Sequence, residues 1–132
     1  MSTTADTSPA DLSVRTARPD DADGLFALLL QLEPEYTPDR AAFDASFAVL
    51  AADSGSEGDS SSILVADVAG TPVGYALVTI TPLLHANGRS AQLQELVVDE
   101  SRRGTGVGTV LIEAVEALCR AQAVRQLTVP SR

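Results

Sequence analysis

The spacing of apolar residues along the chain predicts alternating strands and helices, beginning with a strand at Leu12–Ala17. After Pro19 the apolar residues recur with helical spacing, and Asp20 or Asp21 stands where a side chain caps the first turn of a helix. Pro34 is expected to end that helix, because proline cannot continue it. The buried face would consist of four leucines: Leu25, Leu28, Leu29 and Leu32.

A second helix is expected to begin near Pro38 and to bury Phe43, Phe47 and Leu50. A polar stretch rich in serine and glycine follows it at Asp53–Ser62. Neither side of this stretch contains a complete core. We therefore expect a flexible loop within one domain, not a boundary between two domains.

The middle of the chain predicts three antiparallel strands joined by two turns. The first two strands, Ile63–Val68 and Val73–Ile80, flank the turn sequence AGTP. A second turn, HANGRS, occupies His85–Ser90 and leads into a third strand at Ala91–Val98.

The C-terminal third predicts one helix at Val107–Gln122 and one short strand at Arg125–Val129. The apolar face of this helix comprises Val107, Leu111, Ala114, Val115 and Leu118. The resulting order, β-α-α-β-β-β-α-β, indicates a single α/β (α+β) domain over residues 11–132. Residues 1–10, rich in Ser, Thr, Ala and Asp, are expected to form a disordered tail.

The composition narrows the function classes without selecting one. A formal net charge of -9 over 132 residues argues against nucleic-acid binding, which needs a basic surface. The charge suits a cationic substrate or an organism with an acidic proteome, and it does not separate the two. One cysteine excludes an internal disulfide and a multi-cysteine zinc site. The sequence has neither an apolar run long enough for a membrane helix nor a signal peptide, so a cytoplasmic protein is expected.

A glycine-rich turn, with Gly104, Gly106 and Gly108 directly behind two arginines, is the strongest chemical signal. Successive backbone N–H groups at a helix N-terminus form a site for anions such as phosphate, and glycine lets the backbone approach the ligand. A P-loop would need a lysine and a hydroxyl residue after the last glycine, whereas Thr109 and Val110 stand there. The dinucleotide fingerprint fails as well, because Thr109 occupies the place of its third glycine.

The pattern R-x-x-G-x-G at residues 103–108 resembles the GNAT superfamily of N-acetyltransferases. Three stretches share the resemblance: VRTARPDDADGLFALL, VADVAGTPVGYALV and QELVVDESRRGTGVGTVLIEAVEALC. It implies a central mixed, mostly antiparallel sheet flanked by helices, and acetyl-CoA as cosubstrate without a metal. The main chain of Leu96, Val97 and Val98 would bind the pantetheine arm. The pyrophosphate would lie against the glycine turn, with Thr109 capping: Arg103, Gly104, Thr105, Gly106, Val107, Gly108 and Thr109. A tight strand-to-helix turn without a ligand is the alternative.

The resemblance also implies direct transfer of the acetyl group to a primary amine of a small molecule, a protein N-terminus or a lysine. Glu95, just before the pantetheine segment, is the candidate base; a solvated or salt-bridged strand residue is the alternative reading. Tyr75 is expected to pack in its strand or to face the substrate cleft. His85 is expected at the surface and Cys119 in the core. The Asp20–Asp23 cluster suits a helix N-terminus and needs no metal.

The resemblance fails at the C-terminus, where nothing follows QLTVPSR. Members of the superfamily continue with a helix and strands that contribute an asparagine to the cofactor site and a tyrosine that protonates the leaving thiolate. The fold is therefore expected to be C-terminally truncated, with Leu127 and Val129 at an open edge that favours a homo-oligomer. Three interpretations stay open: an acetyltransferase, a noncatalytic acetyl-CoA-binding remnant, and a partner-dependent fragment.

Overall fold

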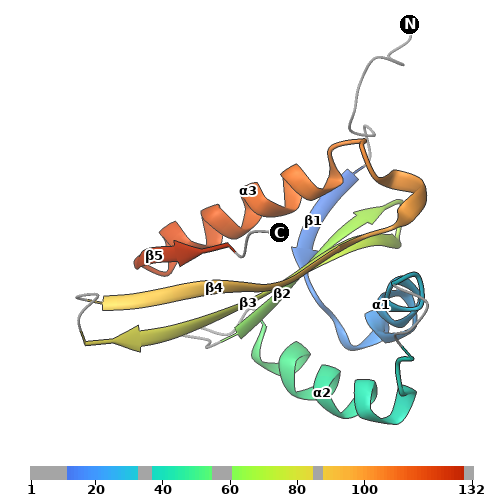
Figure 1. Cartoon of the computed structure of the whole chain (residues 1–132), viewed down its shortest axis with the longest axis horizontal. Helices are drawn as coiled ribbons and strands as arrows, with labels where there is room; N and C mark the ends of the chain where they lie inside the picture. The colour runs from blue at the N-terminus through green and yellow to red at the C-terminus, as the bar shows by residue number, and fades with distance from the viewer. Residues whose placement is uncertain (1–11, 33–36, 55–60, 85–87, 130–132) are drawn as a thin grey trace, which may run out of the picture.

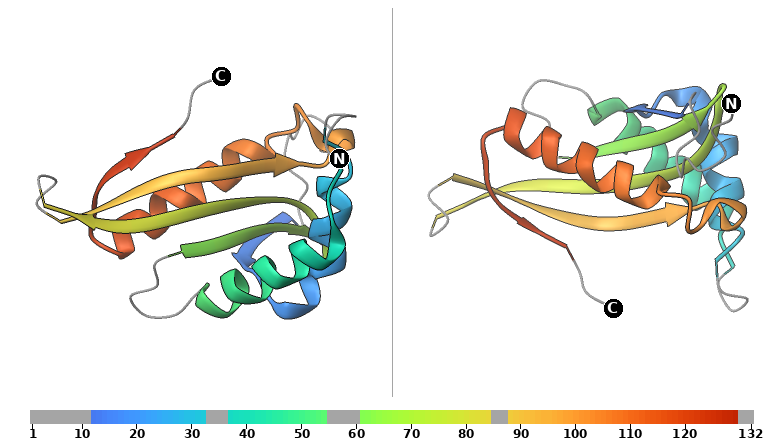
Figure 2. Two further views of the ribbon diagram at one scale, coloured as in Figure 1. Left: turned by 60° about the horizontal axis from the view of Figure 1, so that its bottom comes forward. Right: turned by 90° about the horizontal axis from the view of Figure 1, so that it is seen from above.

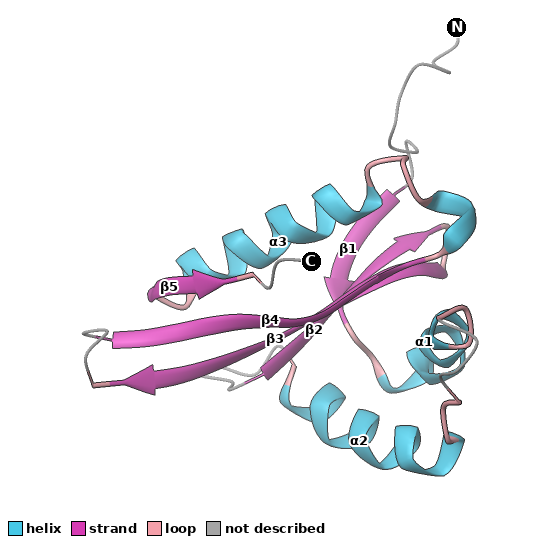
Figure 3. Cartoon of the chain, viewed as in Figure 1, coloured by secondary structure: helices cyan, strands magenta, loops and turns pink. Residues whose placement is uncertain are grey.

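The computed structural model describes residues 12–32, 37–54, 61–84 and 88–129, which form one five-stranded sheet with helices on both faces (Figures 1 and 3). The strands lie in the order β1-β2-β3-β4-β5; neighbours are antiparallel except β4 and β5, which are parallel. This mixed α/β arrangement confirms the predicted fold class and element order. The strands are β1 (Leu12–Thr16), β2 (Ser61–Val68), β3 (Thr71–Leu83), β4 (Gly88–Val98) and β5 (Val124–Thr128), and the helices are α1 (Ala22–Leu29), α2 (Arg40–Asp53) and α3 (Val107–Ala121).

Several predicted boundaries were wrong. The α1 helix ends at Leu29, and the amide of Leu32 donates to the carbonyl of Leu29, a tighter turn than the α-helix makes. Leu32 thereby leaves the buried face and is 36% exposed. Pro34 lies outside the described residues.

The strands are longer than the alternation of residues predicts. Ser61 and Ser62, expected in a loop, are buried residues of β2, and the amide and hydroxyl of Ser61 both donate to the Asp53 carboxylate at 2.9 Å. Residues 88–90, expected in a turn, begin β4. In both places, pairing with β3 extends the strand beyond the apolar residues that define it in the sequence. His85 and the rest of that turn up to residue 87 lie outside the described residues.

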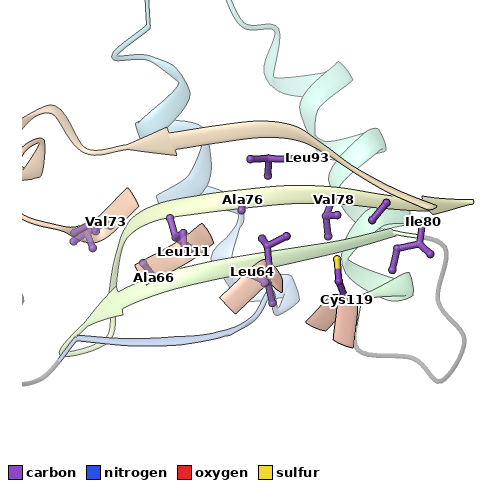
Figure 4. Close-up of a cluster of buried hydrophobic side chains, with 12 residues drawn as sticks. Leu64, Ala66, Val73, Ala76, Val78, Ile80, Leu93, Leu111 and Cys119 are labelled. Carbon is purple, nitrogen blue, oxygen red and sulfur yellow. The ribbon is translucent and has the colours of Figure 1, made fainter. Parts of the chain in front are cut away.

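Two hydrophobic clusters lie on opposite faces of the sheet. Under α3, helix residues at intervals of four (Val107, Leu111, Val115 and Cys119) pack on the side chains of β2, β3 and β4 (Figure 4). Cys119 is a packing residue, as predicted. On the other face, α1 and α2 cover β2 and β3 and enclose Leu25, Phe47 and Val65. Figure 1 shows α3 above the sheet with α1 and α2 below it.

A β-bulge in β4 shifts the alternation of its side chains, so residues after the bulge point to the face opposite to the one that strict alternation would give them. Leu93 pairs with Val78 and Glu95 pairs with Leu77, which leaves Gln94 as an extra residue on β4. Leu93 accordingly belongs to the cluster under α3, while Val97 belongs to the cluster under α1 and α2. Without the bulge, strict alternation would place Glu95 on the α3 side with Leu93.

The β5 strand pairs only with the first part of β4, residues 89–92, and then diverges from it (Figure 2). Beyond Gln92 the β5 side of β4 therefore has no strand beside it in the described part of the chain. This opening runs from Leu93 to Val98, directly up to the turn that leads into α3.

A partly buried ion cluster ties β1 to the rest of the sheet. The guanidinium of Arg15 donates to both oxygens of Asp21 at 2.8 Å and to Asp67 at 2.8 Å. Burial opposes the charged state of Asp21, but the hydrogen bonds from Arg15 and from the Arg18 amide hold its pKa below the ordinary value. The prediction that an aspartate side chain caps α1 was wrong. Asp21 is the N-cap residue of α1, but its carboxylate accepts hydrogen bonds from Arg15 and from the Arg18 amide and none from the amides of α1.

Among the described helices, none has both the length and the apolar character of a membrane-spanning segment. The described residues likewise contain no group of three or more His, Cys, Asp or Glu side chains placed to hold a metal ion.

Candidate active site

The open edge of β4 presents backbone groups that β3 does not use. The amide of Asp99 donates to the carbonyl of Val73 at 2.9 Å, which fixes the phase of the antiparallel ladder. Hydrogen-bonded pairs alternate in such a ladder, so Val97 bonds to its partner on β3. The N–H and C=O groups of Leu96 and Val98 then point to the open edge. Of the three residues proposed for pantetheine, these two offer their main chain.

The glycine turn has the backbone geometry that an anion site requires. Gly104 has φ 84° and Gly106 has φ 95°, and Gly106 is the N-cap of α3. The amide and hydroxyl of Thr105 both donate to the carbonyl of Arg102, which closes the turn. Thr105 therefore uses its amide inside the turn and does not offer it to a ligand.

The first turn of α3 supplies the remaining N–H groups. The amide of Val110 is the first that donates to a helix carbonyl, that of Gly106, at 3.0 Å. The amides of residues 107–109 precede it, and helix geometry leaves them without an intrahelical acceptor. They point out of the N-terminus, where the helix dipole favours negative charge. Thr109, expected as a cap, is instead the third residue of the helix.

These groups line a hollow of about 460 Å³, here called the α3 hollow: Val98, Arg102, Arg103, Gly104, Gly106, Gly108 and Thr109. A Cβ built on Gly104 would meet nothing within 4 Å, so this glycine serves the backbone conformation. Sequence reasoning named all of these residues except Arg102, although the pair of arginines before the glycines was visible. Val107, named with them, is 1% exposed and packs in the core. Two guanidinium groups and free amides together suit a pyrophosphate.

The side chain of Glu95 lies on the face of the sheet that α1 and α2 cover, because the bulge at Gln94 turns it away from α3. The hydroxyl of Tyr75 donates to Oε1 of Glu95 at 2.7 Å. Tyr75 is 4% exposed and packs among the core residues of that face, which agrees with the first of the two alternatives, packing in its strand. Glu95 itself is exposed and forms no salt bridge with another described residue.

A second, larger hollow of about 630 Å³ lies on this face, here called the α2 pocket. Its walls come from α1, α2, β2, β3, β4 and the segments that follow α1 and precede α2: Leu25, Leu29, Leu32, Pro38, Asp39, Ala42, Phe43, Ser46, Phe47, Leu50, Ile63, Tyr75, Leu77, Gln94, Glu95, Leu96 and Val97. Its volume lies in the range of small-molecule sites. Sequence reasoning recognised Phe43, Phe47 and Leu50 as apolar helix positions but had no signal that they line a pocket.

One segment of β4 serves both hollows. Residues 94–97 line the α2 pocket and Val98 lines the α3 hollow. The exposed main-chain edge at Leu96 and Val98 lies between the carboxylate of Glu95 and the N-terminus of α3. An elongated ligand bound along this edge would thus have an anionic end at α3 and a reactive end near Glu95.

Cys119 has no part in this arrangement. Burial raises the pKa of its thiol, and the nearby carboxylate of Glu116 raises it further. A buried thiol of this kind is a poor nucleophile.

Comparisons with known proteins agree with this geometry. The sequence model of the Acetyltransferase (GNAT) family matches residues 25–131. No curated protein matches the sequence of the chain.

Solved structures resemble the whole described fold. An acetyltransferase from Trypanosoma brucei aligns with TM-score 0.74 at 22% identity, covering 92% of this chain and 84% of the other. Glucosamine-6-phosphate N-acetyltransferase from Arabidopsis thaliana aligns with TM-score 0.76 at 22% identity, covering 92% and 82%. Ribosomal-protein-alanine N-acetyltransferase from Brucella melitensis biovar Abortus aligns with TM-score 0.70 at 21% identity, covering 92% and 80%. With a family match over most of its length and this fold, the chain belongs to the GNAT acetyltransferase family.

Proposed function

We propose that this protein transfers the acetyl group of acetyl-CoA to a primary amine. The observation that carries the proposal is the continuity of β4, whose residues 94–98 connect the α2 pocket to the α3 hollow. A family that uses acetyl-CoA needs one site for the pyrophosphate, one for the extended arm and one for the acceptor. The three sites have candidates in order along this strand.

The residues suited to hold acetyl-CoA are those whose hydrogen-bonding groups point to the α3 hollow or to the open edge of β4. The amides of residues 107–109 and the guanidinium groups of Arg102 and Arg103 would bind the pyrophosphate, with Gly104 and Gly106 shaping the turn. The outward N–H and C=O groups of Leu96 and Val98 would bind the pantetheine amides as an added strand does. When bound, acetyl-CoA supplies an activated acetyl thioester.

Glu95 acts as the base in this proposal. A primary amine is mostly ammonium at neutral pH, and it must lose a proton before the nitrogen can attack. The nitrogen forms a bond to the acetyl carbonyl carbon while the carbon–sulfur bond breaks. Of the two protons that the nitrogen loses, one is taken up by the Glu95 carboxylate and passes to solvent, and the other ends on the sulfur of the released thiol. The Tyr75 hydroxyl holds the carboxylate in place.

Release of free thiol tests the proposal. Wild-type protein is incubated with acetyl-CoA and a mixture of primary amines, thiol release is followed over time, and N-acetyl products are identified by mass spectrometry. The proposal requires amine-dependent thiol release that is lost in Glu95→Gln. Binding of acetyl-CoA without release for any amine would favour the noncatalytic alternative.

A further inference from the structure

Twelve of the seventeen residues that line the α2 pocket are apolar. The aromatic rings of Phe43 and Phe47 stack with centroids 5.5 Å apart, and leucines of α1 and α2 surround them. The other five carry polar groups, of which some are already bonded: Asp39, Ser46, Tyr75, Gln94 and Glu95. The side-chain amide of Gln94 donates to Oγ1 of Thr79 at 3.0 Å, and the hydroxyl of Tyr75 donates to Glu95.

The charged groups of the pocket all have the same sign. Glu95 on β4 and Asp39 at the start of α2 are acidic, and no Lys, Arg or His is among the described residues that line it. Arg40 follows Asp39 in the chain, but its guanidinium lies 5.2 Å from the centroid of the Phe26 ring and is paired with Asp23 and Asp44. The pocket therefore attracts a cation and offers no positive side chain to an anionic substituent.

We propose that the acceptor is a monoamine with a hydrocarbon or aryl substituent, an inference that rests on the proposed acetyl transfer. The ammonium group lies at Glu95, and the substituent lies among Phe43, Phe47 and the leucines. Burial of an apolar substituent in this pocket is favourable, since both surfaces leave water. A phosphorylated amine would find no positive side chain on these walls, and sugar hydroxyl groups placed against the phenylalanine and leucine side chains would lose water without gaining a hydrogen bond.

A comparison of three acceptors tests the proposal. The specificity constant kcat/KM is measured for 2-phenylethylamine, glucosamine and glucosamine 6-phosphate at saturating acetyl-CoA. We expect 2-phenylethylamine to be preferred by about tenfold or more over both sugars, because its ring suits the phenylalanine and leucine side chains, which offer no partner to a sugar hydroxyl.

A pair of variants on α2 links the preference to the pocket. Ala42 lines the pocket and Ala41 does not, while both are exposed in the first turn of the same helix. Ala42→Arg adds a cation to the wall and should raise the dissociation constant of 2-phenylethylamine about tenfold. Ala41→Arg adds the same charge outside the pocket and should leave it unchanged. Affinity is measured by calorimetry with the protein saturated with CoA, so no transfer occurs.

The outcomes separate this proposal from the proposed function. Preference for either sugar, with transfer observed, overturns the apolar acceptor and leaves acetyl transfer standing. Binding of 2-phenylethylamine that Ala42→Arg weakens, without transfer to any amine, supports the pocket and overturns the enzymatic activity. Absence of 2-phenylethylamine binding to the wild type overturns the pocket assignment whatever the activity.

Discussion

The buried hydroxyl of Tyr75 on β3 donates a hydrogen bond of 2.7 Å to the carboxylate of Glu95 on β4. The two residues are diagonal neighbours across the strand pair, since Tyr75 is opposite Val97 and Glu95 is opposite Leu77. Diagonal neighbours share a face of the sheet, so a rigid core residue fixes the direction of an exposed carboxylate. That direction is into the α2 pocket.

Replacement of Glu95 by glutamine should lower kcat about a hundredfold or more, because the amide keeps the shape but cannot accept the proton. The affinity for acetyl-CoA should stay unchanged, since the α3 hollow does not include Glu95. Steady-state kinetics at saturating substrates and calorimetry measure the two quantities. Glu113→Gln, an exposed position on α3, is the control. Unchanged turnover in Glu95→Gln would remove this residue from the mechanism.

The ion cluster of Arg15, Asp21 and Asp67 should make the free energy of unfolding fall at acidic pH. The pKa of Asp21 is lower in the folded protein than in the unfolded chain, where it is about 4. The ionised carboxylate therefore adds to the free energy of unfolding above pH ~4, and this stabilisation is lost as the pH falls from there through the pKa of the folded state. Asp21→Asn should lower the free energy of unfolding at neutral pH by about 3 kcal/mol and flatten its decline in acid. Asp20→Asn, an exposed neighbour, should do neither. Urea unfolding between neutral and acidic pH measures both effects, and equal slopes for wild type and Asp21→Asn would contradict the assignment.

The turn between β2 and β3 has a residue that is poorly suited to its conformation. Ala69 has φ 53° and Gly70 has φ 89°, a combination that favours Asn-Gly in two-residue hairpins. Ala69→Asn should stabilise the fold by about 0.5–1 kcal/mol, because asparagine adopts positive φ more readily than alanine. Ala69→Val should have the opposite effect. Thermal and urea unfolding of the three proteins measure the difference; a less stable Ala69→Asn would show that the turn tolerates alanine without strain.

We propose that the outer edge of β5 mediates self-association. In the described part of the chain β5 ends the sheet order, and Val129 beside it is 46% exposed. Edge strands of this kind recruit other strands, and lysine suppresses that pairing. Sedimentation velocity should show a dimer or larger species that Val129→Lys shifts toward monomer. Val49→Lys, at an exposed apolar position on α2, should have no such effect. A wild-type protein that stays monomeric at high concentration would contradict the proposal.

Local patterns predicted most of the elements and the glycine turn. The residues of that turn are neighbours in the chain, and the role proposed for them depends on glycine geometry at one helix N-terminus. Leu96 and Val98 could likewise be named from the sequence, because both lie at the end of one strand, just before that turn. The register between β3 and β4 could not be predicted in this way, and it is this register that pairs the main chain of Val97 with β3, so that Val97 does not offer it to a ligand.

The rest of the site depends on long-range geometry that composition does not encode. The bulge at Gln94 decides the face of Glu95, and a one-residue change in pairing would reverse it. The hydrogen bond from Tyr75 exists only in that register. The walls of the α2 pocket include residues of α2 and of β4, which are far apart in the sequence, so its apolar residues were indistinguishable from core.

Calorimetric titration with acetyl-CoA measures whether the N-terminus of α3 holds the pyrophosphate. Gly106→Asp places a carboxylate at the N-cap, whereas Gly106→Asn adds a side chain of the same shape without the charge, so any strain from the φ of 95° is shared by the two variants. The wild type should bind acetyl-CoA, Gly106→Asn should bind it more weakly, and Gly106→Asp should not bind it. A wild-type protein without measurable binding, or equal binding by Gly106→Asp and Gly106→Asn, would contradict this pyrophosphate site.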